Sequence, residues 1–184
     1  IWLGILAMLD SEKGKYDLSS VRTMVIGGSA APPSLIQGFQ ERHGLTVTHA
    51  WGMTETNPLG TLARVKPHMR GDAKRELDAR STQGFAVPFV ETRHVDDEGK
   101  VLPWDGKEMG ELEVRGPWVA ASYFGDEGKD RFTADGWFKT GDVVTIDEEG
   151  YVTITDRSKD VIKSGGEWIS SLAVENALMS HPAV

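Results

Sequence analysis

The chain has 184 residues, of which 39% are hydrophobic and 26% charged, close to the values of ordinary globular domains. This composition excludes a disordered chain and a fibrous repeat, and the length is enough to bury a substantial core in one or two domains. The formal net charge of −8 argues against a protein that coats nucleic acid or an anionic membrane, because both functions need clustered lysine and arginine.

The start of the chain and its lack of cysteine bear on where the protein works. The opening run IWLGILAML is far shorter than the roughly 20 residues of a bilayer-spanning helix and lacks the features of a secretory signal, so we expect a buried helix end and no membrane span. Without cysteine, disulfides and thiolate metal sites are excluded, and we expect a cytoplasmic protein. Because the chain opens on Ile1 inside an apolar run and stops at HPAV, we expect a piece of a longer protein.

The first half of the sequence predicts a strand, a helix and a second strand. VRTMVIGG is a short apolar strand that ends in a glycine pair, and PPSLIQGFQERHG is a helix with Pro33 near its start and Gly44 at its end. LTVTHAWG alternates like a second strand. Such a unit is usually parallel, and loops at the carboxyl ends of its strands form a crevice. The loops GGSAAP and WGMTET follow these strand ends.

From about Pro88, short β-like runs predict a small antiparallel subdomain. These runs are VPFVETRHV, GELEVRG, DVVTI and YVTIT, separated by the turn signals DDEGK and DEEG. After DRSKD, the segment VIKSGGEWISSLAVENALMSHP combines a glycine turn with a helical pattern that ends before Pro182. The sequence therefore predicts an α/β chain in three sections, 1–87, 88–158 and 159–184.

The stretch HAWGMTETNPLG concentrates residues that suit a nucleotide. The Trp51 indole can stack on a planar base, and Gly52 allows a sharp turn and a close approach to a ligand. Thr54 offers a donor to a phosphate oxygen, and Glu55 offers a carboxylate to magnesium. Taken alone, the same residues also describe a core tryptophan, a turn cap and a solvated glutamate, so the stretch leaves both interpretations open.

Three other places carry similar alternatives. Gly28 and Ser29 follow a strand and expose bare backbone to a flat ligand, but they lack the spacing of GxGxxG or GxxxxGKS and also describe an ordinary tight turn. Asp142, in WFKTGD before the strand VVTI, suits the hydroxyls of a ribose or a simple turn. A further cluster marks a junction or a solvated connector, and it contains Arg157, Lys159, Lys163, Gly165 and Gly166.

Hydrolase and metalloenzyme functions find little support in the sequence. The five histidines show no metal-ligand spacing, and no serine lies in a GxSxG nucleophile elbow.

In this order, GGSAAP, HAWGMTET, GELEVRGP, GWFKTGD and DRSKDVIKSGGEWIS resemble the adenylate-forming superfamily of acyl-CoA synthetases, luciferases and peptide-synthetase adenylation domains. The resemblance extends from about Val25 to the end of the chain. Five ordered motifs are far more specific than any one of them, and together they favour the functional interpretation at each place. AWGMTETNPLGT and KSGGEWISS are most similar to medium- and long-chain fatty-acyl-CoA synthetases.

The resemblance implies a reaction in two steps. A carboxylic acid attacks ATP to give acyl-adenylate and pyrophosphate, and coenzyme A then displaces AMP to give a thioester. The resemblance places Trp51 over the adenine, where a tyrosine is more common, with Gly52 beside it. It assigns Thr54 to the α-phosphate and Glu55 to Mg²⁺. The remaining residues that it implies are Gly28, Ser29 and Ala30 along the adenine and acyl side, and Asp142 and Arg157 at the ribose.

The resemblance also divides the chain. Residues 1–87 and 88–158 become the α/β and β-rich portions of a large N-terminal domain, and 159–184 the start of a mobile α+β C-terminal domain. Lys159 falls at the hinge on which that domain rotates, and Lys163 matches a lysine used in the second step. Gly165 and Gly166 border the pantetheine tunnel.

Two further elements of the superfamily are expected outside this sequence. A phosphate-binding loop is expected before Ile1, and a lysine that stabilises the adenylation transition state beyond Val184. We therefore expect the 184-residue chain alone to be inactive in adenylate formation.

Alternative functions stay open at this point. One is an adenylating enzyme for a short acid such as a methylthio-propionate, and another transfers the acyl group to a carrier-protein thiol or to oxygen. KSGGEW favours coenzyme A. A third is a nucleotide-binding module without chemistry, against which the retained Thr54, Glu55, Asp142, Arg157 and Lys159 argue.

Overall fold

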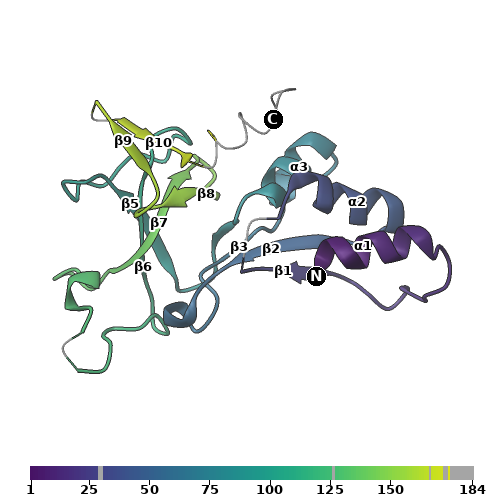
Figure 1. Cartoon of the computed structure of the whole chain (residues 1–184), viewed down its shortest axis with the longest axis horizontal. Coiled ribbons are helices and arrows are strands. Elements are labelled where there is room, and N and C mark those ends of the chain that lie inside the picture. The colour runs from purple at the N-terminus through teal and green to yellow at the C-terminus, as the bar shows by residue number, and fades with distance from the viewer. Residues whose placement is uncertain (29–30, 126, 166, 172–173, 175–184) are drawn as a thin grey trace.

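The computed structural model describes residues 1–28, 31–125, 127–165, 167–171 and 174. Figure 1 shows a part that contains three helices and a sheet, next to a second part built of antiparallel strands. The first part contains α1 (Trp2–Ser11), β1 (Met24–Ile26), α2 (Pro33–His43), β2 (Val47–Trp51), β3 (Thr61–Leu62), α3 (Ala73–Ser81) and β4 (Phe85–Ala86). The strand order is β1-β2-β3-β4. No helix among the described residues is both long enough and apolar enough to cross a bilayer.

The predicted strand, helix and strand are confirmed. Strands β1 and β2 pair in parallel, with Ile26 opposite His49. Pro33 starts α2, where its missing N–H costs nothing, and Gly44 ends it in the left-handed conformation at φ 65. The helix buries Ile36 and Phe39 in a core that also contains Val47 and two leucines of α1. The two strands therefore end at the same edge of the sheet.

Residues 61–87 form elements that the sequence analysis does not assign. Strands β3 and β4 have two residues each, too few to show an alternating pattern. Helix α3 is mostly polar and buries only Ala79, so it lacks an apolar stripe. The side chain of Asp72 caps it by accepting hydrogen bonds from the backbone N–H groups of Lys74 and Arg75.

The second part is the expected antiparallel sheet. It consists of β5 (Glu91–Val95), β6 (Gly110–Arg115), β7 (Phe138–Ile146) and β8 (Val152–Arg157), in that order. One face packs Leu112, Val114, Phe138 and Val144 into a core that also includes Trp51. A single apolar cluster therefore joins the end of β2 to the antiparallel sheet.

Strand β7 begins earlier than the sequence analysis expects. Asp142 lies inside the strand rather than before it, because the TGD segment pairs with the neighbouring strands. Gly141 adopts φ 76, and the pairing of β7 with β8 shifts register between Val143 and Val144. An irregular strand of this kind re-aims side chains next to the shift.

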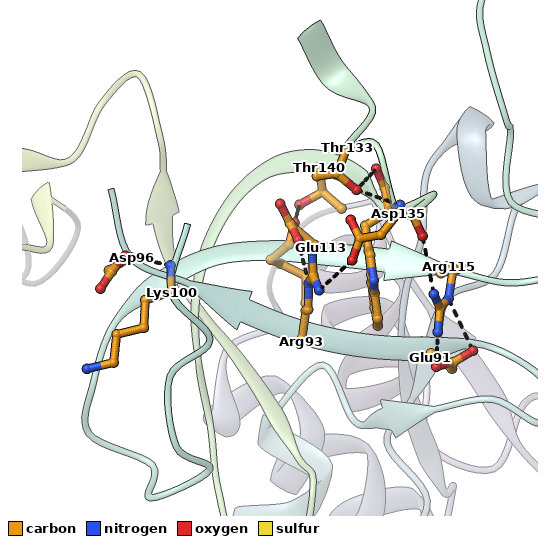
Figure 2. A network of polar contacts seen from close by, with 11 residues as sticks. Glu91, Arg93, Asp96, Lys100, Glu113, Arg115, Thr133, Asp135 and Thr140 are labelled. Carbon is orange, nitrogen blue, oxygen red and sulfur yellow. Dashed lines mark hydrogen bonds and ion pairs between the residues drawn. The ribbon is translucent and has the colours of Figure 1, made fainter. Parts of the chain in front are cut away.

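The opposite face of the antiparallel sheet carries a network of charged side chains (Figure 2). Arg93 Nε lies 2.6 Å from Glu113 Oε2, and Arg93 Nη1 lies 3.1 Å from Asp135 Oδ2. The guanidinium carbons of Arg93 and Arg115 lie 4.3 and 4.6 Å from the ring centroid of Trp137. Charged side chains and a stacked indole therefore cover part of this face.

A short hairpin follows the antiparallel sheet. Strands β9 (Ile162–Ser164) and β10 (Glu167–Ile169) pair antiparallel. The contacts that tie the segment to the second part include Lys163 Nζ, 2.5 Å from Asp97 Oδ1, and the Ser171 backbone N–H, which donates to Asp156 Oδ2 at 2.6 Å.

Candidate functional site

A cavity of about 220 Å³ lies where the carboxyl ends of β1 and β2 meet β7 and β8. Five residues that the sequence singled out line it: Gly28, Trp51, Gly52, Asp142 and Arg157. A larger apolar cavity of about 660 Å³ lies between Leu59, Phe89 and Trp118 and contains none of the predicted site residues. The smaller cavity is the better candidate, because it combines bare backbone, an indole and a fixed charge pair.

Asp142 is held on both oxygens. The Trp51 indole N–H donates to Oδ2 at 2.9 Å, and Arg157 Nη1 lies 2.8 Å from Oδ1. The Asp142 side chain is 4% exposed and that of Arg157 is 56% exposed. Burial raises the pKa of the Asp142 carboxyl, and the Trp51 hydrogen bond and the Arg157 charge oppose this rise. The carboxylate is therefore fixed in orientation, with its guanidinium partner accessible from solvent.

The Trp51 ring is fixed by its own neighbours. Trp51 is buried, and the Gly60 backbone N–H donates to the Trp51 carbonyl at 3.0 Å. A Cβ on Gly60 would approach the Trp51 Cζ3 atom to 2.4 Å, so only glycine leaves room for the indole there. Trp51 thus serves both the core and the cavity wall.

The two glycines of the wall are required for different reasons. Gly28 has φ 86, a conformation that other residues rarely adopt, and faces open space. At Gly52, an added Cβ would lie 1.8 Å from the Pro58 carbonyl oxygen. At Gly52, the backbone at the end of β2 therefore lies directly against the backbone of the following turn, at Pro58.

Thr54 and Glu55 lie in the 3₁₀ turn Thr54–Thr56, directly after the Met53 wall of the cavity. They are not among the residues that line the cavity. The Tyr123 hydroxyl donates to Glu55 Oε1 at 2.5 Å, and the Ala120 backbone N–H donates to the Glu55 carbonyl at 2.8 Å. The bond to Glu55 raises the pKa of Tyr123. Glu55 is thus tied to a distant segment at both its side chain and its backbone.

The predicted residues after β8 lie apart from the cavity. Lys159 is exposed in the turn after β8, where the Asp160 and Val161 backbone N–H groups both donate to the Arg157 carbonyl at 2.9 Å. Lys163 contacts Asp97 and lies 4.4 Å from the Trp168 ring centroid. Gly165 adopts φ 62 in the hairpin turn. The predicted Ser29, Ala30 and Gly166 lie outside the described residues.

The sequence analysis missed several residues of the cavity wall: His49, Ala50, Met53, Gln83 and Ile154. His49 precedes Trp51 by two positions on the same strand, so the period of two could have placed both on one face. No such signal exists for Gln83, which comes from a loop. Its side-chain Oε1 accepts the Ile154 backbone N–H at 2.6 Å and links that loop to β8.

The donor set near the cavity fits some metals and not others. The described residues contain no group of three or more His, Cys, Asp or Glu side chains able to hold a metal ion. Glu55 is a single half-buried carboxylate beside the cavity. A lone carboxylate suits Mg²⁺, which typically uses one or two carboxylates and completes its shell with water and substrate phosphates.

Comparisons with known proteins show which family this chain is similar to. The family of AMP-binding enzymes matches residues 1–124. A long-chain-fatty-acid–CoA ligase of Thermus thermophilus is 46% identical over 100% of this chain and 34% of its own length. A 3-methylmercaptopropionyl-CoA ligase of Ruegeria lacuscaerulensis is 48% identical over 99% of this chain and 33% of its own length.

The solved structures include an O-succinylbenzoate coenzyme A synthetase from Bacillus subtilis in complex with ATP and magnesium ion. Its TM-score is 0.76 at 34% identity, covering 98% of this chain and 36% of that chain. The chain thus spans about a third of the length of the proteins it matches.

Proposed function

This chain belongs to the AMP-binding enzyme family, and we propose that the full-length protein containing it is a fatty-acyl-CoA synthetase. Such an enzyme activates a carboxylic acid with ATP to give acyl-adenylate and pyrophosphate, then transfers the acyl group to coenzyme A. The observation that carries the proposal is the cavity shared by Trp51, Asp142 and Arg157 beside the Gly28 backbone. An indole, a fixed charge pair and bare backbone suit a base joined to a ribose.

In this proposal AMP is bound by groups from both parts of the molecule. Each oxygen of a carboxylate accepts more than one hydrogen bond, so Asp142 can accept from a ribose hydroxyl while it keeps its protein partners. The exposed guanidinium of Arg157 has further N–H groups that can donate to the same ribose while Nη1 stays paired with Asp142. Trp51 covers the adenine, and Gly28 with Ser29 and Ala30 completes the adenine and acyl side.

Thr54 and Glu55 serve the phosphates. Thr54 contacts the α-phosphate, and Glu55 provides the protein ligand of Mg²⁺. An ion held by Glu55 would supply positive charge to offset the charge that develops on the phosphates during adenylate formation. The residues of this turn orient the nucleotide, and their place directly after the cavity wall supports the assignment.

We assign the second half-reaction to the segment after β8. Residues 1–87 and 88–158 then belong to one N-terminal domain, and 159–184 begin a C-terminal domain that turns at Lys159. Lys163, Gly165 and Gly166 face coenzyme A after the turn. Lys159→Pro should slow thioester formation from supplied acyl-adenylate more than adenylate formation, because proline fixes φ. Equal effects on both steps would remove the hinge role.

The proposed substrate is a medium- or long-chain fatty acid. The proposed location of the enzyme is the cytoplasm. A methylthio-propionate is the second candidate, because the relatives named for the two kinds of acid are similarly close in sequence. Chains without cysteine suit the reducing cytoplasm.

The test is thioester formation by the full-length protein with coenzyme A, ATP and acids from about three to sixteen carbons. We expect turnover with a fatty acid and loss of turnover in Asp142→Ala. Turnover confined to the short acid would select the second candidate. ATP binding without turnover on any acid would overturn the proposal in favour of a non-catalytic nucleotide-binding module.

A further inference from the structure

Tyr123 reaches Glu55 from a distant segment of the chain. Its hydroxyl lies 2.5 Å from Glu55 Oε1, across 68 positions of sequence. Tyr123 belongs to the connection between β6 and the 3₁₀ turn Lys129–Arg131, whereas Glu55 follows β2. Among the described residues, this hydroxyl is the single hydrogen-bond partner of the Glu55 carboxylate. Within the described part of the chain, one carboxylate oxygen is therefore engaged by a hydrogen bond and the other is not.

The position of the Tyr123 hydroxyl is set by packing of its ring. The ring centroid lies 5.6 Å from that of Phe132 and 6.3 Å from that of Phe138, both in edge contacts. A Cβ on Gly128 would approach the Tyr123 Cδ2 atom to 2.7 Å, so the ring occupies a narrow slot. Since neighbours on both sides of the 3₁₀ turn Lys129–Arg131 and at the start of β7 hold the ring, the donor points at Glu55 from a fixed place.

The Glu55 backbone is fixed from the same segment. The Ala120 backbone N–H donates to the Glu55 carbonyl at 2.8 Å, three residues before Tyr123. Backbone and side chain are thus held together by one short stretch, residues 120–123. A glutamate held at both ends loses the rotational freedom that a solvated glutamate keeps.

We propose that Tyr123 is a positioning residue that makes Glu55 a one-oxygen ligand and so favours Mg²⁺ over Ca²⁺ at the nucleotide phosphates. This inference rests on the proposed function, because it takes Glu55 as the cation ligand. Mg²⁺ demands near-octahedral geometry with single oxygens, whereas Ca²⁺ accepts carboxylates through one or both oxygens in flexible geometry. Because the phenol already donates to Oε1, Glu55 presents Oε2 to a cation, and binding of Ca²⁺ through both oxygens must compete with the Tyr123 hydrogen bond.

A purely structural role for the same hydrogen bond predicts a different result. In that case the bond only fastens the 3₁₀ turn to the second part, and its loss lowers stability without changing which cation binds. Cation preference therefore separates the two roles, and stability alone does not.

The experiment compares Tyr123→Phe with Tyr16→Phe in the full-length protein. Tyr16 is a matched control, because its hydroxyl donates to Glu12 Oε2 at 2.6 Å on the surface, far along the chain from the site. Binding of Mn²⁺ together with α,β-methylene ATP is measured by electron paramagnetic resonance, and Mg²⁺ and Ca²⁺ compete for the site. The readout is the ratio of the two competing dissociation constants, which needs no acid, coenzyme A or turnover.

We expect Tyr123→Phe to reduce the preference for Mg²⁺ over Ca²⁺ by about fivefold or more, because a hydrogen bond to a charged group is lost. Tyr16→Phe should leave the preference unchanged. In a Glu55→Gln background, Tyr123→Phe should have no further effect, because the two residues act through one contact. Thioester formation from supplied acyl-adenylate should be the same in Tyr123→Phe and the parent.

An unchanged cation ratio in Tyr123→Phe would overturn the inference, as would an effect of equal size in the Glu55→Gln background. Either result is compatible with normal thioester formation and so leaves the proposed function standing. Failure of the proposed function is recognised separately, by absence of thioester with every acid.

Discussion

Asp142 and Arg157 face each other across the neighbouring strands β7 and β8, with Arg157 Nη1 2.8 Å from Asp142 Oδ1. The pair joins a buried acceptor to a half-exposed donor at the edge of the cavity. A pair of this kind is not a simple surface ion pair, because the carboxylate is almost fully buried. Its geometry leads to the first prediction.

Asp142→Asn should raise the dissociation constant for AMP by about 10- to 100-fold, measured by calorimetric titration of the full-length protein. The amide keeps the size of the side chain and can still accept from Trp51, but it removes the charge that faces Arg157. Glu148→Gln, at an exposed position in the β7 to β8 turn, is the control for loss of one negative charge. AMP affinity that is equal in the two variants would contradict a ribose role for Asp142.

Trp51→Phe should weaken the recognition of the ribose as well as that of the base. Phenylalanine keeps a ring at the cavity wall but removes the N–H that fixes Asp142 Oδ2 at 2.9 Å. We expect about a tenfold loss of AMP affinity and a smaller difference between AMP and 2′-deoxy-AMP. Trp118→Phe is the matched control, because that indole donates to the Leu59 carbonyl at 3.3 Å, outside the cavity. If Trp51→Phe leaves discrimination against the deoxynucleotide intact, the indole does not position Asp142.

Gly52→Ala should destabilise the fold, because the added Cβ would lie 1.8 Å from the Pro58 carbonyl oxygen and backbone must shift to admit it. We expect a loss of about 2–3 kcal/mol in the free energy of unfolding, measured by urea denaturation. Gly4→Ala is the control, since a Cβ there meets nothing within 4 Å and alanine favours the helix. Equal stabilities of the two variants would show that the turn after β2 is not tightly packed.

The stability of the fold should depend on pH through His94. This residue is fully buried in β5, its Nδ1 atom has no hydrogen-bond partner among the residues that the structure describes, and its Nε2 atom lies 3.2 Å from the Glu108 carbonyl. Burial lowers the pKa of His94 below its ordinary value of 6.5, against weaker opposing effects of Glu108 and Asp105. The unfolded chain therefore binds more protons than the folded chain as the pH falls below 6.5.

The stabilising contribution of neutral His94 is complete above pH 6.5 and is lost progressively below it, so the free energy of unfolding should rise between pH 5.5 and pH 7.5. Urea denaturation at the two values measures the rise. His94→Gln should reduce it, because the amide does not titrate. His43→Gln is the comparison, since that histidine, unlike His94, lies 2.8 Å from a carboxylate oxygen, Asp10 Oδ1. A rise of unchanged size in His94→Gln would assign the pH dependence to other groups.

Much of the fold can be predicted from short local patterns in the sequence. Pro33 and Gly44 mark the ends of α2 because each is favoured only at one position of a helix. The alternation of LTVTHAWG fixes β2, and the turn signals DDEGK and DEEG separate strands that pair with their neighbours. Helix α3 and the two-residue strands were not predicted, because their stability comes from contacts outside their own short segments.

The sequence by itself determined the ordered motifs, and with them the family and the residues worth testing. Only the tertiary structure decided how those residues meet. The Trp51 to Asp142 hydrogen bond spans 91 positions and the Tyr123 to Glu55 bond spans 68, distances over which no periodic pattern carries information. Gln83 enters the cavity from a loop, and the TGD segment joins β7 because neighbouring strands supply its hydrogen bonds. Side-chain orientation depends on packing between segments, so it is settled only when the chain has folded.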